Sequence, residues 1–97
     1  MKTFEEIKDI LAKYKEELSQ KYKVREIGIF GSYIRGEQRE KSDVDILVEF
    51  EEPVSLLKLV SLENFLKEIT DIKVDVVPKK DVRPELKERI LKEVIYV

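Results

Sequence analysis

Two short stretches of this sequence hold the residues whose types and spacing could do chemistry. The first is Gly31-Ser32, followed by Arg35, and the second is the pair Asp43 and Asp45. A glycine lets the backbone approach a phosphate closely, and the Ser32 hydroxyl with the N–H groups of the following turn can hold a triphosphate. Arg35 could add a phosphate contact, or it could equally anchor the loop through a salt bridge. Each stretch alone also has an ordinary explanation, as a strand end or as a solvated acidic pair.

The acidic residues point to a site for divalent cations. Asp43 and Asp45 are two positions apart on a predicted strand, so both carboxylates leave the same face. Adjacent carboxylates repel, and either a proton or a hard cation with oxygen ligands relieves that repulsion. Asp75 lies in the middle of a valine-rich strand and joins the pair if the two strands are neighbours. Three carboxylates can hold two magnesium ions about 3.5–4 Å apart, as in-line phosphoryl transfer requires.

Composition excludes several other classes of chemistry. The 97 residues contain no histidine and no cysteine, which excludes His-based hydrolases, His or Cys zinc sites and disulfide frameworks. A P-loop is excluded because Glu37 and Gln38 stand where its Lys and Ser or Thr should follow. The net charge of −2 argues against nonspecific binding to nucleic acid, which requires a positive surface. Neither a signal peptide nor a membrane span is visible, so a cytoplasmic protein is expected.

The hydrophobic pattern predicts one α+β domain over residues 1–97. Apolar residues at steps of three and four predict helices over 3–22, 55–70 and 84–94, and 32–35 forms a short helical turn. Alternating or β-branched residues predict strands over 24–30, 44–50 and 72–77. The expected architecture is a small mixed sheet of three or four strands covered by helices on one face. The first two strands must run antiparallel, because Gly31 ends one and Asp43 begins the next while both must meet one triphosphate.

The combined pattern Gly-Ser-x-x-Arg-Gly-x5-Ser-Asp-x-Asp, with a later strand Asp, resembles the DNA polymerase β-like nucleotidyltransferase superfamily. In size the chain is similar to the minimal nucleotidyltransferases (MNT), many of which are antitoxins paired with HEPN-domain partners. The resemblance implies that Gly31 and Ser32 bind the triphosphate, that Asp43 and Asp45 bind two Mg²⁺ ions, and that Asp75 is the third catalytic carboxylate. It also implies transfer of AMP from ATP to an acceptor hydroxyl, on a HEPN-type toxin partner.

Two other roles are compatible with the same residues. The domain could be a binding module that neutralises a partner protein by contact, with nucleotide as a structural ligand. The acidic strand could also be merely exposed and structural. Tyr33 has two readings as well, since its ring could stack on a nucleotide base or pack against the first helix.

Overall fold

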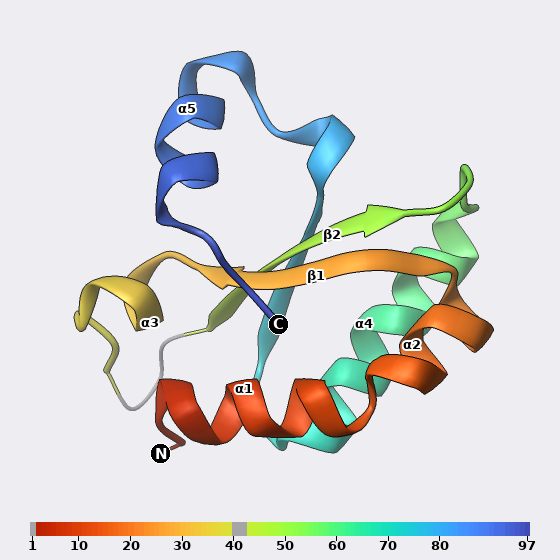
Figure 1. The fold of residues 1–97 in the computed structure, drawn as a ribbon, viewed down its shortest axis with the longest axis horizontal. Helices are drawn as coiled ribbons and strands as arrows, with labels where there is room; N and C mark the ends of the chain where they lie inside the picture. Colours follow the sequence, from red (N-terminus) through yellow and green to blue (C-terminus); the bar gives the residue numbers. More distant parts are fainter. Residues whose placement is uncertain (1, 40–42) are drawn as a thin grey trace.

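The computed structural model describes residues 2–39 and 43–97. Ser42, which belongs to the sequence motif, lies outside the described residues. The elements follow one another in the order shown in Figure 1. Their bounds are α1 Phe4–Lys13, α2 Lys15–Tyr22, β1 Val24–Phe30, α3 Ser32–Arg35, β2 Val44–Phe50, α4 Leu56–Thr70, β3 Val74–Pro78, the 3₁₀ turn η1 Lys79–Asp81, α5 Pro84–Glu93 and β4 Ile95–Tyr96.

A mixed four-stranded sheet forms the centre of the molecule, with the order β3-β2-β1-β4. Strands β1 and β2 are antiparallel, as are β1 and β4, whereas β2 and β3 are parallel. The predicted α+β class and mixed sheet are therefore confirmed, and so are the antiparallel first pair and the pairing of the third strand with the second. The sequence pattern did not predict β4, which pairs its two residues with Gly28 and Ile29 of β1.

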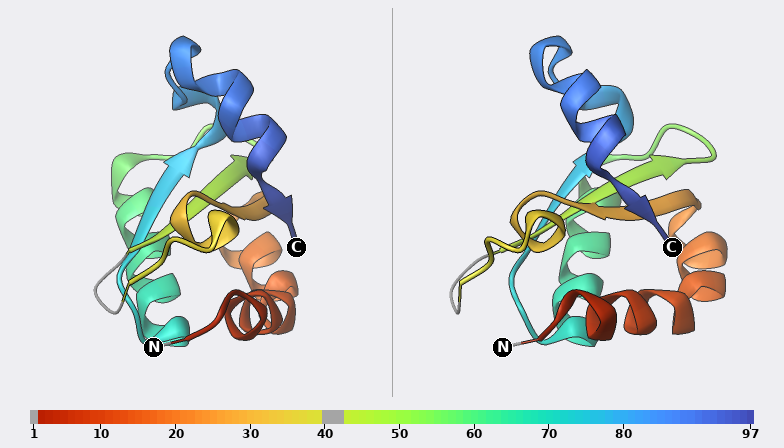
Figure 2. Two further views of the ribbon diagram at one scale, coloured as in Figure 1. Left: turned by 90° about the vertical axis from the view of Figure 1, so that its left-hand side faces the viewer. Right: turned by 60° about the vertical axis from the view of Figure 1, so that its left-hand side comes forward.

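Helices cover both faces of the sheet, so the prediction of one covered face is wrong. Figure 2 shows α5 on one side of the sheet and α1, α2 and α4 on the other. Every second strand residue faces the larger core under those three helices, where Ile46, Ile7 and Leu62 are fully buried. The alternate residues face α5, and Leu47 and Phe30 form a second apolar cluster with Ile90 there. The face that carries Asp45 is therefore partly apolar and partly covered.

The first predicted helix is divided at Tyr14 into α1 and α2. Its start is as predicted: the Thr3 hydroxyl accepts the Glu6 N–H at 3.1 Å, and the Glu6 carboxylate accepts the Thr3 N–H at 3.1 Å. The rings of Tyr14 and Tyr22 both contact Phe65 of α4, with centroid distances of 5.7 and 5.2 Å. In a straight helix, residues eight positions apart are separated by about 12 Å along the axis, too far to share one ring. The break lets both rings pack there.

Candidate functional site

Strand pairing brings the predicted site residues to one end of the sheet. Asp45 on β2 is level with Phe30, the last residue of antiparallel β1, and with Asp75 on parallel β3. Gly31 follows Phe30 directly, so it reaches the same end. Asp43 is exposed and stands one residue before the observed start of β2. The glycine turn and the two strand carboxylates therefore come from three adjacent strands.

Gly31 lies against the Asp45 carboxylate. Its backbone has φ +83° and ψ −149°, a conformation that is essentially restricted to glycine. A Cβ atom added here would overlap Oδ2 of Asp45 and lie 3.0 Å from its Cγ. Glycine is thus required twice at this position, for its backbone conformation and for the close approach of Asp45.

The carboxylates make this end of the sheet strongly acidic. Burial, and then the negative charges of Asp75 and Asp43, raise the pKa of Asp45 from 3.8 to about 6. Arg35 opposes this effect and Glu93 adds to it. Within residues 2–39 and 43–97, the side chains of Asp43, Asp45 and Asp75 form no hydrogen bond and no ion pair. A bound cation would stabilise the ionised form of Asp45.

The donor set fits magnesium. Over residues 2–39 and 43–97, no three acidic side chains are close enough together to enclose an ion by themselves. Magnesium does not require such a cage, because it usually keeps several waters and is held by one or two carboxylates together with substrate phosphates. Asp43, Asp45 and Asp75 offer only hard oxygen ligands. A polyphosphate at the Gly31 turn could supply the remaining oxygens.

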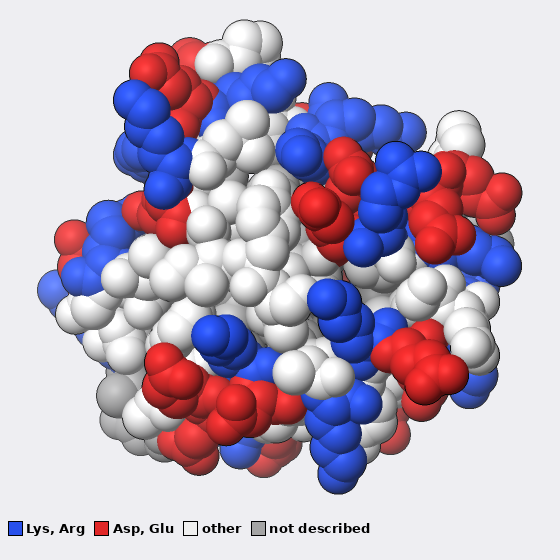
Figure 3. Space-filling view, viewed as in Figure 1, with Lys and Arg blue, Asp and Glu red and all other residues white. Residues whose placement is uncertain are grey.

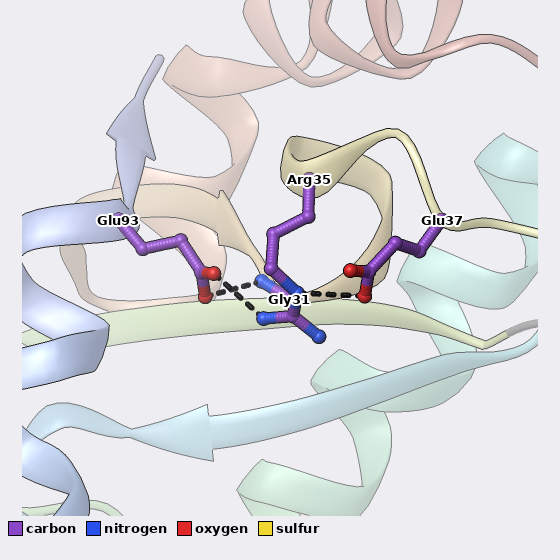
Figure 4. Close-up of polar contacts among 4 residues, drawn as sticks. All are labelled: Gly31, Arg35, Glu37 and Glu93. Carbon is purple, nitrogen blue, oxygen red and sulfur yellow. Dashed lines mark hydrogen bonds and ion pairs between the residues drawn. The ribbon is translucent and has the colours of Figure 1, made fainter.

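Arg35 is held in a salt bridge on each side (Figure 4). Its Nε donates to Oε1 of Glu37 at 2.9 Å, and its Nη1 donates to Oε1 of Glu93 at 2.6 Å. These contacts raise the pKa of Arg35. Of the two roles open to Arg35, the structure shows loop anchoring. Its phosphate contact stays a prediction.

Glu93, the last residue of α5, is a site residue that sequence reasoning missed. Its Oε2 accepts the backbone N–H of Gly31 at 2.9 Å, while Oε1 accepts from Arg35. Burial alone would raise the pKa of Glu93, but the contacts with Gly31 and Arg35 together outweigh burial and lower it. Nothing in the local sequence distinguishes Glu93 from the other acidic residues of its charged helix. Only its packing against Gly31 does.

Ser32 and Tyr33 begin the short helix α3 next to the glycine. The Ser32 side chain is half-buried, and its predicted triphosphate contact is not tested by the structure. Tyr33 is 4% exposed and belongs to the larger apolar core. Burial, and secondarily the charge of Asp43, raise the pKa of the Tyr33 phenol. Of its two predicted roles, core packing is the one observed.

A cavity of about 470 Å³ lies at the other end of β2, away from the carboxylates. Its lining includes Glu49, which lies 3.5 Å from Lys79 and 3.9 Å from Arg25 in ion pairs. None of the three aspartates lines it. We therefore place the candidate site at the Gly31 turn, where the glycine backbone and the strand carboxylates meet, and not at this cavity.

The described residues form no helix that could cross a membrane, and the face drawn in Figure 3 has no broad basic region. None of the helices formed by residues 2–39 and 43–97 is both long and apolar enough to cross a membrane. Figure 3 shows Lys and Arg interspersed with Asp and Glu around an uncharged central stretch. This face therefore lacks the continuous positive surface that nonspecific binding to nucleic acid requires.

Comparison with known proteins decides the family. The sequence model for the nucleotidyltransferase domain matches residues 11–97. The chain belongs to the nucleotidyltransferase domain family. This nucleotidyltransferase is 50% identical over 97 residues to the protein adenylyltransferase MntA of Thermococcus cleftensis, covering 100% of this chain and 98% of the relative.

Solved structures agree with this assignment. A structure provisionally described as a minimal nucleotidyltransferase superposes with a TM-score of 0.75 at 34% identity, covering 92% of this chain and 93% of that one. A chain in the structure of a tri-AMPylated Shewanella oneidensis HEPN toxin with its MNT antitoxin has a TM-score of 0.66 at 20% identity, covering 92% of this chain and 70% of that one. The second likeness shows a shared fold. The family match and the protein adenylyltransferase relative identify the chain as an enzyme of the nucleotidyltransferase class.

Proposed function

We propose that this nucleotidyltransferase uses magnesium to transfer AMP from ATP to a hydroxyl group on a HEPN-type toxin partner, with residues 1–97 acting as one domain. The observation that carries the proposal is the meeting of Gly31 with Asp45, which is itself level with Asp75. A glycine turn at the start of a helix thereby adjoins carboxylates whose repulsion a cation would relieve. Few other ligands than a metal-bound polyphosphate satisfy both features.

Each residue of the site has a distinct part in this proposal. Gly31 and Ser32 bind the triphosphate, since the glycine begins a turn beside the carboxylates and the serine offers a hydroxyl. Asp43 and Asp45 hold the metal ions. Bound there, magnesium would neutralise the phosphate oxygens and lower the pKa of the attacking hydroxyl. The ionised state of Asp45 is the one that binds metal, so its raised pKa makes metal binding sensitive to protons.

Asp75 would receive the proton from the acceptor. It is exposed, and β3 is an edge strand, so a partner can approach it from solvent. As the acceptor oxygen forms its bond to the α-phosphorus of ATP, the bond from that phosphorus to pyrophosphate breaks. The hydroxyl proton passes to Asp75, and pyrophosphate leaves with the bonding electron pair.

Support for a protein acceptor comes from the relatives. The Thermococcus cleftensis relative is named a protein adenylyltransferase, and the Shewanella oneidensis complex contains a HEPN toxin that carries AMP groups. A second protein also completes the site economically, since Asp43 and Asp75 are exposed and Asp75 is on the edge strand β3. A modified tyrosine on such a toxin would gain charge and bulk at its own surface.

The test is co-expression with a HEPN-domain protein encoded beside this chain, followed by intact-mass measurement of that protein. We expect an AMP-sized mass gain with the wild type and with Asp9→Ala, an exposed α1 substitution that serves as the matched control. The gain should be absent with Asp43→Ala. If both this variant and the wild type neutralise the partner with no mass change, the protein is a binding module and the catalytic proposal fails.

A further inference from the structure

Glu93 links α5 to the phosphate-binding turn across the fold. The Glu93 side chain is 11% exposed, and its two oxygens are divided between Gly31 N–H at 2.9 Å and Arg35 Nη1 at 2.6 Å. Figure 4 shows Glu93 reaching the turn from α5, with Arg35 between it and Glu37. One carboxylate thus contacts both the start of the turn and the end of α3.

The location of this carboxylate is unfavourable on local grounds. A negative charge in the last turn of a helix opposes the helix dipole, and burial disfavours the charged form. Glu93 also adds negative charge beside Asp45, whose pKa it raises further. Residues that conflict with their local environment tend to occur at functional sites. The contacts with Gly31 and Arg35 compensate for this conflict, and they are all directed at the turn.

Gly31 has no side chain through which the fold could fix it. Its conformation therefore depends on contacts of its backbone, and its N–H donates to Glu93. The Asp45 carboxylate leaves no space for a Cβ at this position. Gly31 thus lies against two carboxylates, one that accepts its N–H and one that is proposed to bind metal.

We propose that Glu93 is a positioning residue, which fixes the conformation of the phosphate-binding turn beside the metal-binding carboxylates and keeps Arg35 beside the turn. This inference rests on the proposed nucleotidyl transfer. Both Glu93 oxygens are engaged, so the residue is not free to accept a proton from an acceptor. Its loss should therefore weaken nucleotide binding and leave the rate of the chemical step largely unchanged.

The experiment compares Glu93→Gln and Glu93→Ala with Glu88→Gln. The glutamine carbonyl can still accept the Gly31 N–H but loses the ion pair with Arg35, whereas alanine loses both contacts. Glu88 is on the same helix, is 82% exposed and pairs with Lys92, which makes it a matched control. Calorimetry would give the affinity for a nonhydrolysable ATP analogue with magnesium, and transfer assays would give KM and kcat. Amide hydrogen exchange would report the Gly31 N–H directly.

We expect Glu93→Ala, which loses both contacts, to weaken binding of the analogue and to raise the KM for ATP about tenfold. Glu93→Gln should change both less than about threefold and keep the Gly31 amide protected, and kcat should stay within about threefold in both variants. Unchanged affinity in Glu93→Ala would overturn this inference alone. A collapse of kcat in Glu93→Gln at unchanged KM would make Glu93 catalytic and overturn it too. A wild type that fails to bind the analogue would overturn the proposed function as well.

Discussion

Replacing Asp45 with asparagine should stabilise the metal-free protein at neutral pH. The charged groups that face Asp45 are Asp43 before β2, Asp75 on β3, Arg35 on α3 and Glu93 on α5. Burial and the net negative charge of this set raise its pKa from 3.8 to about 6. A raised pKa means that the folded state prefers the protonated side chain. The resulting stabilisation is complete below pH 3.8 and is lost as the pH rises through about 6.

The size of the effect follows from the same pKa. The difference between 3.8 and about 6 corresponds to about 3 kcal/mol, at about 1.4 kcal/mol for each pH unit. Asp45 is only half-buried, so solvent screening reduces this figure to about 1–2 kcal/mol. Asparagine has nearly the same shape but no charge. At neutral pH, Asp45→Asn should therefore raise the free energy of unfolding by about 1–2 kcal/mol, or the melting temperature by about 4–16 °C.

Urea unfolding followed by circular dichroism, in the presence of a chelator, measures this difference from about pH 4 to about pH 7. The stability of the variant minus that of the wild type should be small near pH 4 and should increase through pH 6. Carboxylates that do not interact with Asp45 cancel in the subtraction, and Asp9→Asn on the exposed face of α1 is the matched control for removing a surface carboxylate. A flat difference for Asp45→Asn, or one that declines with rising pH, would refute the electrostatic description of the site.

Three further outcomes are expected. Gly31→Ala should lower the free energy of unfolding by about 3 kcal/mol or more, because of backbone strain and overlap of the added Cβ with Asp45. Gly36→Ala should lower it by about 1 kcal/mol, because nothing lies within 4 Å of its added Cβ. Similar losses for the two variants in urea unfolding would contradict this. Magnesium with ATP at a hundred times its Kd should stabilise the wild type by about 2.7 kcal/mol, and thermal unfolding should show no such shift for Asp43→Asn/Asp45→Asn. Calorimetry at about pH 5 and pH 7.5 should find weaker magnesium binding at the lower pH, because protons compete for Asp45; pH-independent affinity would exclude Asp45 as a ligand.

The strands that carry the site could be predicted from the local sequence. Alternating apolar residues gave β2 its observed bounds, Val44–Phe50, and the β-branched and aromatic run before Gly31 did the same for β1. The face of Asp45 follows from that alternation, because successive strand side chains point to opposite sides of the sheet. The expected chemistry added one long-range constraint. The prediction that Gly31 and Asp43 meet one triphosphate requires β1 and β2 to be antiparallel, and they are.

Packing between distant segments decided the rest. Ile95–Tyr96 is too short to show a period, so its place as a fourth strand depends on the open edge of β1. The position of α5 on the second face depends on the apolar surface that Leu47 and Phe30 expose there only once the sheet has formed. Glu93 meets Gly31 across 62 residues. In the sequence, a glutamate in a highly charged helix cannot be distinguished from a solvated side chain. Only the fold brings a buried N–H within hydrogen-bonding distance of it, because hydrogen bonding and burial depend on distance in space and not on distance along the chain.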